Sequence, residues 1–275
     1  ALGARHRVFI TGHGAAQVEE HLRRANPAQA MHVVRQEPQR GTGHAVMQAM
    51  PLLPDDGLVV VLSGDVPLIT AATLSRLVQA CQGESLALLT VCPADPTGYG
   101  RVVRNGSGQV QAIVEQKDAN EAQRAIGEVY SGIMAAPTRL LRAWLARLDN
   151  RNAQAEYYLT DVVAKAVADG VTVQAILCDD LAQVAGVNSP AQLAELERIH
   201  QRRQAEQLMA QGVRLLDPSR FDLRGELTCA ADVQIDVNCV FAGRVVLGEG
   251  VQIGAHCVLS DCQIEAGAQI LPFTH

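Results

Sequence analysis

Residues 58–68 are LVVVLSGDVPL: five consecutive apolar residues, a Ser-Gly pair, and an aspartate shortly before a proline. A short continuous apolar run is typical of a strand that is buried on both faces of a parallel sheet. In open α/β sheets, ligands bind beyond the carboxyl ends of the strands, and Asp65 stands at such a place. Asp65 therefore has the position and the chemistry to bind a divalent cation, although a turn before Pro67 explains it equally well.

Strand-like and helix-like segments alternate on both sides of this stretch. The segments with strand patterns are 7–11, 32–34, 86–91, 109–115 and 171–177, and the helical patterns are 16–24, 44–53, 71–81 and 190–211. Such alternation predicts an α/β domain with a mostly parallel, doubly wound, Rossmann-like sheet. We place this domain at residues 1–215.

From Ile235 onward the pattern changes to one apolar residue every six positions, with a slip of one after Leu259. This pattern is the signature of hexapeptide repeats in a left-handed parallel β-helix. A series of antiparallel strands would show a period of two and hairpin turns instead. We expect residues 216–275 to form a linker and the first coils of such a helix, with these side chains inside: Ile235, Phe241, Leu247, Ile253, Leu259, Ile264 and Ile270.

The composition narrows the class of protein. The chain has 275 residues, and 48% of them are hydrophobic, which is enough for packed domains. Its net charge of −6 argues against nucleic-acid and membrane-surface partners. No apolar run approaches the length of a membrane-spanning helix. Seven cysteines without a C-x-x-C pair indicate reduced thiols in a cytoplasmic protein. Because the first residue is alanine and the last coil ends without a cap, we expect the chain to be cut at both ends.

Residues 36–44, QEPQRGTGH, stand between a predicted strand and a predicted helix. The glycines let backbone N–H groups approach a ligand, and the start of the next helix favours anions or carbonyl oxygens. Gln36 and Thr42 offer the donors and acceptors that the edge of a nucleobase needs. A tight turn between strand and helix explains the glycines equally well, so both interpretations stay open.

Four more short motifs follow in order along the chain. Each one alone is best explained as a turn or a helix cap, but their order and spacing together form a stronger signal. They are DPTGYGR at 95–101, IVEQKD at 113–118, QAEYYLTD at 154–161 and GVN at 186–188.

Taken together, the motifs resemble the bacterial family of bifunctional N-acetylglucosamine-1-phosphate uridyltransferases / glucosamine-1-phosphate acetyltransferases. The resemblance covers nearly the whole chain and continues through RFDLRG at 220–225 into the repeats. Other sugar-1-phosphate nucleotidyltransferases share the Gly-Asp pair but rarely the rest. The family's first strand and its triphosphate-binding loop would precede Ala1, and its acetyltransferase residues would follow His275.

The resemblance also implies roles for individual residues. One group would hold the uracil of UTP, a second would carry Mg²⁺, and a third would hold the sugar, with Gly64 beside the nucleotide. In that order the groups are Gln36, Gly41 and Thr42; Asp65 and Asn188; and Gly100, Glu115, Tyr158 and Thr160. One position departs from the family, because Tyr130 stands where an asparagine is usual.

The implied reaction is uridylyl transfer from UTP to N-acetylglucosamine-1-phosphate. Its products are UDP-N-acetylglucosamine, a precursor of peptidoglycan and lipopolysaccharide, and pyrophosphate. The family assembles as homotrimers through its β-helix. Two alternatives remain: an inactive, trimerising β-helical module, and a sugar-1-phosphate nucleotidyltransferase that uses another base.

Overall fold

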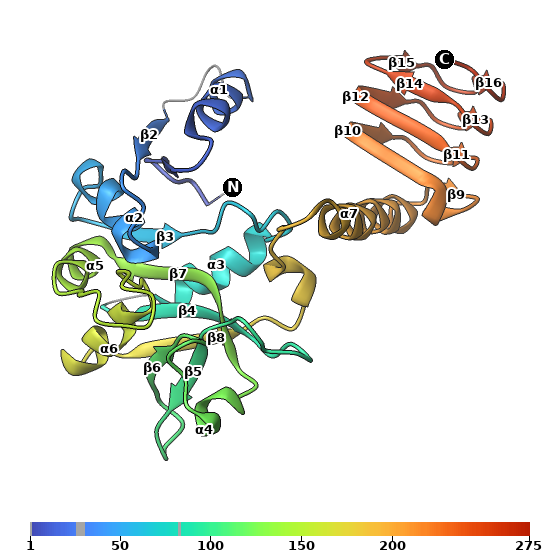
Figure 1. Cartoon of the computed structure of the whole chain (residues 1–275). Helices are drawn as coiled ribbons and strands as arrows, with labels where there is room; N and C mark the ends of the chain where they lie inside the picture. Colours follow the sequence, from blue (N-terminus) through green and yellow to red (C-terminus); the bar gives the residue numbers. More distant parts are fainter. Residues whose placement is uncertain (1, 26–30, 82–83) are drawn as a thin grey trace. The chain divides into compact units, whose positions relative to one another are not determined.

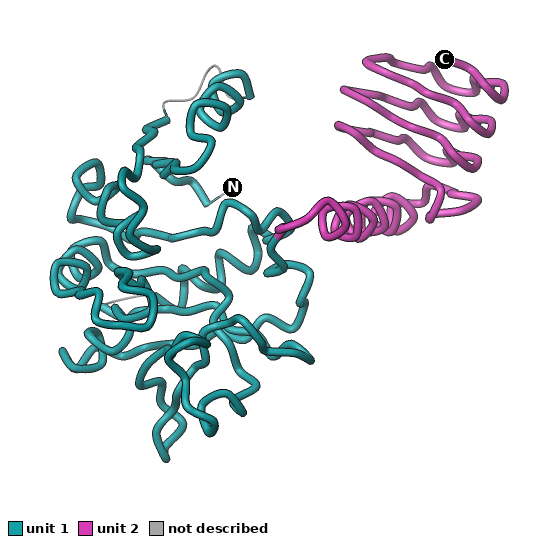
Figure 2. The backbone as a smooth tube through the Cα atoms, viewed as in Figure 1, with its two compact units in different colours: residues 1–186 teal, residues 187–275 magenta. Residues whose placement is uncertain are grey.

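The computed structural model describes residues 2–25, 31–81 and 84–275. They form two compact units, residues 1–186 and 187–275 (Figure 2). The predicted domain limits at 215 and 216 stay a prediction; in the structure α7 (Pro190–Ala210) packs on strands of the second unit. Among the described residues, no helix combines the length and the hydrophobicity that crossing a membrane requires.

The first unit is built on a six-stranded sheet with the order β6-β5-β7-β4-β8, in which β3 also pairs with β7. Among the described pairs of this sheet only β4 with β8 is parallel, so the expectation of a mostly parallel sheet is wrong. The short connection between β5 and β6 makes them an antiparallel hairpin, and β7 then pairs antiparallel with β5. The strands are β3 (Leu58–Val61), β4 (Leu86–Val91), β5 (Arg101–Arg104), β6 (Val110–Val114), β7 (Val129–Pro137) and β8 (Val173–Leu177).

Strand β4, and not β3, is the strand buried on both faces. Leu86 and Leu88 enter one hydrophobic cluster, whereas Ala87 and Leu89 enter another on the opposite face. By contrast, Leu58 at the start of β3 is 42% exposed, and the rest of the strand is half-buried. The reason is pairing: among the described residues β3 has a neighbour on one side only, namely β7.

Helices cover both faces of this sheet (Figure 1). The cluster with Leu86 contains side chains of α2, α5 and α6, including the fully buried Trp144, and the cluster with Ala87 contains side chains of α3. The short helices of this unit connect its strands. The bounds are α2 (Thr42–Ala49), η1 (Met50–Leu52), α3 (Ala71–Ala80), α4 (Glu121–Arg124), α5 (Thr138–Leu145), α6 (Asp161–Ala168) and η2 (Leu181–Val184).

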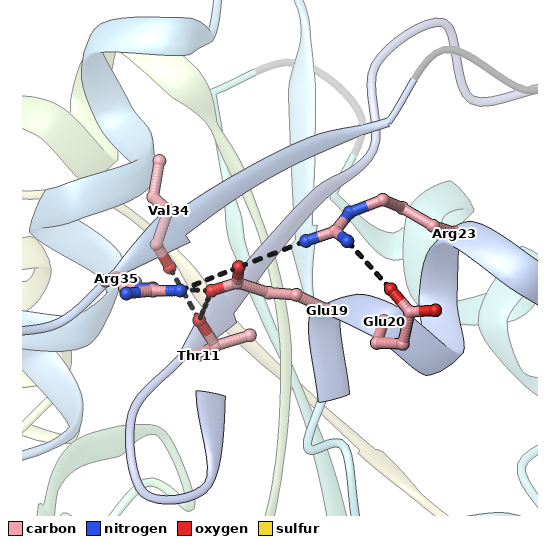
Figure 3. A network of polar contacts seen from close by, with 6 residues as sticks. All are labelled: Thr11, Glu19, Glu20, Arg23, Val34 and Arg35. Atoms are coloured by element: carbon pink, nitrogen blue, oxygen red, sulfur yellow. Dashed lines mark hydrogen bonds and ion pairs between the residues drawn. The ribbon is translucent and has the colours of Figure 1, made fainter. Parts of the chain in front are cut away.

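A separate two-stranded parallel sheet joins β1 (Val8–Thr11) to β2 (His32–Arg35), with α1 (Ala15–Ala25) beside it. Figure 3 shows the polar network that ties the three elements together. Glu19 of α1 accepts two hydrogen bonds from Arg35, at 2.6 and 3.0 Å, and one from the Thr11 hydroxyl at 3.3 Å. The Arg35 guanidinium holds the pKa of Glu19 below its ordinary value. This network orients α1 against the strand that leads into the glycine loop.

All the strand pairs of the second unit are parallel. They stack in two sheets: one contains the two nine-residue strands and two short ones, and the other contains only two-residue strands (Figure 1). After η3 (Pro218–Arg220) the first sheet has β10 (Phe221–Cys229), β12 (Cys239–Leu247), β14 (Val258–Ser260) and β15 (Gln263–Ile264). The second has β9 (Arg214–Leu215), β11 (Gln234–Ile235), β13 (Gln252–Ile253) and β16 (Gln269–Ile270).

The chain returns to the same place every three hexapeptides. Phe221 pairs with Cys239, which lies 18 residues further on, and Gln234 pairs likewise with Gln252. Later, Gln252 pairs with Gln269, a step of 17, so the slip in the sequence pattern is a one-residue shortening of a coil. The predicted inner residues from Ile235 to Leu259 are buried, and Ile264 and Ile270 pack against them.

Candidate functional site

The glycine loop at 36–44 is docked onto residues 157–159. The Gly43 N–H donates to the Tyr157 carbonyl at 2.7 Å, and the Tyr157 N–H donates to the Arg40 carbonyl at 2.8 Å. Gly41 has a φ of +99°, and a Cβ there would lie 2.7 Å from the Tyr157 oxygen. These glycines are therefore required by the close approach of the chain's own backbone.

The two polar residues predicted to meet a nucleobase also hold this loop together. The Gln36 side-chain amide donates to the Gly41 carbonyl at 2.9 Å and lies 3.1 Å from His44 Nδ1. The Thr42 hydroxyl accepts a hydrogen bond from the Leu159 N–H at 3.0 Å. The proton of that hydroxyl and the amide oxygen of Gln36 remain outside these bonds. Each side chain thus keeps a polar atom for a ligand.

Four residues predicted to contact a sugar form a cluster around Glu115. The Thr160 hydroxyl donates to Glu115 Oε1 at 2.9 Å. A Cβ on Gly100 would lie 3.5 Å from Glu115 Oε2 and 2.7 Å from the Ile113 side chain, so only glycine fits there. Tyr158 is buried, next to the acidic groups of this region. Residues from three distant segments therefore meet at one carboxylate.

The cluster is short of hydrogen-bond partners inside the protein. Burial raises the pKa of Glu115 above its ordinary value, and the bond from Thr160 only partly offsets this. Burial, together with the Asp118 carboxylate, raises the pKa of Tyr158 to about 12. The hydroxyls of Tyr130 and Tyr158 are both buried without a partner among the described residues. Buried polar atoms are nearly always paired, so these hydroxyls mark a place where a polar ligand fits.

Asp65 follows β3 in an exposed turn, next to the exposed Gly64. Its carboxylate makes no hydrogen bond or ion pair with any other described residue. A Cβ on Gly186 would lie 3.1 Å from Asp65 Oδ2, so the space beside this carboxylate depends on a glycine. Within the described part of the chain, no three His, Cys, Asp or Glu side chains are grouped as a metal site.

Asn188 is the second residue of the second unit, which begins at Val187. It is exposed, and its backbone N–H donates to Gln192 Oε1 at 2.8 Å, just before α7. Its predicted role beside Asp65 stays a prediction.

One buried residue of this region was not among the site residues predicted from the sequence. Arg101 follows Gly100 directly and is only 2% exposed. Its motif, DPTGYGR, gives no sign of burial, because an arginine after a turn is usually solvated. Only the pairing of β5 with β6 and β7 encloses it.

Comparison with known proteins identifies the family. A model described as nucleotidyl transferase matches residues 3–181. The chain is 62% identical over 277 residues to the bifunctional protein GlmU of Methylibium petroleiphilum and 65% identical over 277 residues to that of Albidiferax ferrireducens. The protein of the same name from Paracidovorax citrulli is 63% identical over 282 residues.

Each of these alignments includes 100% of this chain and 60% of the relative, so the chain spans about 60% of the length of the relatives that it matches. These identities confirm the resemblance inferred from the motifs, and the match over residues 3–181 shows that the chain belongs to the nucleotidyl transferase family.

Proposed function

We propose that this protein transfers a uridylyl group from UTP to N-acetylglucosamine-1-phosphate. One observation carries the proposal: residues 157–160 hold both halves of the site. The Tyr157 backbone and the Leu159 N–H fix the glycine loop, while Thr160 bonds Glu115 of the second cluster. A base loop and a sugar cluster attached to the same short segment suit a ligand that joins a nucleotide to a sugar.

The chain's own residues would bind and orient the two substrates. Gln36, Gly41 and Thr42 would take the uracil, with Gly64 beside the nucleotide. Gly100, Glu115, Tyr158 and Thr160 would take the sugar. Glu115 and the unpaired Tyr158 hydroxyl can exchange hydrogen bonds with sugar hydroxyl or amide groups, which supplies the partners that they lack in the protein.

The Asp65 region fits a Mg²⁺ ion. Mg²⁺ prefers carboxylate, water and phosphate oxygens, and often binds through only one or two protein ligands. Asp65 offers an exposed, unpaired carboxylate in a space that Gly186 leaves open, and the resemblance adds the side-chain oxygen of Asn188. When bound, the ion would supply charge neutralisation for the phosphate groups in the transition state.

The reaction does not need a general base from the protein. The attacking phosphate of the sugar phosphate is already ionised at neutral pH. Rate enhancement therefore depends on holding that oxygen in line with the α-phosphorus of UTP, and on stabilising the developing charge. This explains why the cluster around Glu115 contains binding groups and no nucleophile paired with a histidine.

For the second unit we propose the first coils of a left-handed parallel β-helix. Its parallel ladders with steps of 18 and 17 residues support this. By the resemblance, the complete protein would be a cytoplasmic homotrimer that also acetylates glucosamine-1-phosphate, and the product would enter peptidoglycan and lipopolysaccharide synthesis.

The test is formation of UDP-N-acetylglucosamine and pyrophosphate by the full protein with UTP, N-acetylglucosamine-1-phosphate and Mg²⁺. We expect Asp65→Asn to lower the rate by about a hundredfold or more, because several kcal/mol of charge stabilisation come through the metal. Asp56→Asn is the matched control, since Asp56 is an exposed aspartate before β3. A near-normal rate in Asp65→Asn would show that the metal assignment is wrong.

Substrate replacement decides between the alternatives. Preference for ATP or GTP over UTP would identify an enzyme that uses another base. Failure to bind any nucleotide sugar, combined with trimers in sedimentation, would identify a β-helical assembly module without this activity.

A further inference from the structure

Arg101 is the one charged side chain among the described residues that is fully buried. It opens β5, and Gly100 and Glu115 of the sugar cluster lie close by. A buried guanidinium is costly unless its donors are well used, and carboxylates usually provide the partners. Arg101 forms no ion pair within the described chain, so its position calls for another explanation.

The hydrogen-bond partners of Arg101 are neutral and flank two different strands: Tyr99 lies just before β5, and Gln116 lies just after β6. Nη1 donates a short hydrogen bond to the Tyr99 carbonyl, and Nη2 donates to Gln116 Oε1 at 2.6 Å. The Nε atom is buried without a partner. The planar guanidinium therefore bridges the residue before Gly100 and the residue after Glu115.

The strand register explains why this bridge matters. In the antiparallel β5–β6 pair, Arg101 faces Val114 and Val102 faces Ile113, so the next pair outward is Gly100 with Glu115. The close approach of a Gly100 Cβ to Glu115 Oε2, 3.5 Å, agrees with that register. The two acceptors of Arg101, Tyr99 and Gln116, thus enclose the Gly100–Glu115 pair at the open end of the hairpin.

We propose that Arg101 is a positioning residue for the sugar: it clamps the two strand ends so that Gly100 and Glu115 keep a fixed separation. This inference rests on the proposed function, because it concerns the same sugar cluster. An arginine suits the task better than a lysine, since its rigid fork reaches two acceptors at once, whereas an ammonium is a point donor on a flexible stem.

Binding of UDP and of UDP-N-acetylglucosamine to the full protein separates the sugar contribution from the nucleotide contribution. In Arg101→Lys we expect UDP affinity to stay within error of wild type and UDP-N-acetylglucosamine affinity to fall about tenfold, or about 1.4 kcal/mol. Arg104→Lys is the control: Arg104 lies on the same strand, but its side chain is 36% exposed and pairs with Glu128. We expect that variant to bind both ligands as wild type does.

A second pair of variants tests the same bridge from its other end. Gln116→Leu removes the acceptor and should reproduce the selective loss of sugar affinity, whereas Gln116→Glu keeps an acceptor and should retain it. If Arg101→Lys does not fold, the two Gln116 variants test the clamp on their own.

The outcomes are distinct. An equal loss of both ligands, or no loss, in Arg101→Lys and Gln116→Leu would overturn the clamp. If the wild-type protein binds UDP-N-acetylglucosamine no more tightly than UDP, the proposed function fails. The basis for a sugar-positioning role then fails with it.

Discussion

Gln201 of α7 forms two hydrogen bonds with the backbone of Leu223 in β10. Its side-chain oxygen accepts from the Leu223 N–H at 2.7 Å, and its amide nitrogen donates to the Leu223 carbonyl at 2.9 Å. β10 is the terminal strand of its sheet, and Gln201 is only 2% exposed. The side chain therefore takes the place of a neighbouring strand at this edge, and α7 caps the stack of coils.

Replacing Gln201 with leucine should destabilise the second unit selectively. The change leaves the N–H and the carbonyl of Leu223 buried without partners, which costs about 1–3 kcal/mol for each group. We expect amide exchange in β10 and β12 to accelerate accordingly. Trp144, the single tryptophan, lies in the first unit, so its fluorescence transition should stay unchanged.

The exposed Gln207 on the same helix provides the control. Gln207→Leu should leave exchange in both strands at the wild-type rate. Equal effects of the two substitutions would show that the Leu223 bonds contribute nothing specific.

Gly225 in β10 of the second unit has no room for a side chain. A Cβ on Gly225 would lie 2.0 Å from the Gly243 carbonyl oxygen of the next coil, a clash with backbone. We expect Gly225→Ala to destabilise the second unit by about 3 kcal/mol or more, beyond ordinary overpacking. At Gly250, where φ is +68° and a Cβ meets nothing within 4 Å, alanine should cost only about 1 kcal/mol of backbone strain. Comparable unfolding free energies for the two variants would contradict this.

The sequence was most informative where the structure is periodic. Each hexapeptide is a local pattern, so the residues inside the coils, from Ile235 to Leu259, could be predicted from spacing alone. Prediction was weaker in the first unit, because strand order and direction depend on pairs between distant segments. The run 58–62 looked buried on both faces, yet β3 has one described neighbour, and β4 fills the central position.

The site shows the same division. The resemblance grouped Gly100, Glu115, Tyr158 and Thr160, and these residues lie near one another in the structure, whereas their roles stay predictions. For Gly41 the structure adds a reason that the sequence did not contain. Its φ of +99° and its closeness to Tyr157 are tertiary features, as is the burial of Arg101. Such contacts join residues far apart in the sequence and leave no local pattern.

Glu115 should make the first unit less stable as the pH rises. Burial raises its pKa above the ordinary 4.5, so the folded state keeps the proton to a higher pH than the unfolded state does. The associated stability is complete below the unfolded pKa and is lost as the pH rises through the folded pKa. Glu115→Gln cannot ionise and avoids that loss. Its unfolding free energy relative to wild type should therefore rise as the pH increases from the unfolded pKa through the higher folded pKa.

Chemical denaturation followed by Trp144 fluorescence measures this difference. Glu195→Gln, on the exposed face of α7, should show no such trend. A pH-independent difference for Glu115→Gln would mean that the carboxyl is ionised in the folded protein without penalty. Loss of sugar binding in Glu115→Gln would show that this carboxyl lowers the stability of the fold but is needed for binding.

Substitutions at Thr42 and at Thr160 should each weaken the binding of a different substrate. The Thr42 hydroxyl accepts from the Leu159 N–H at 3.0 Å, and the Thr160 hydroxyl donates to Glu115 at 2.9 Å. Thr42→Val leaves the Leu159 N–H and the predicted base contact unpaired, and should weaken UTP binding by about 1–3 kcal/mol, roughly ten- to a hundredfold. Its effect on N-acetylglucosamine-1-phosphate should be smaller. Thr160→Val should do the reverse, because it removes the only hydrogen bond that the Glu115 carboxylate accepts from a described residue. Serine at either position keeps a hydroxyl and should restore binding. Titrating each substrate separately against the four variants decides the assignment. If Thr42→Val weakens both substrates equally, the glycine loop is not the base pocket, and the division of labour along residues 157–160 is wrong.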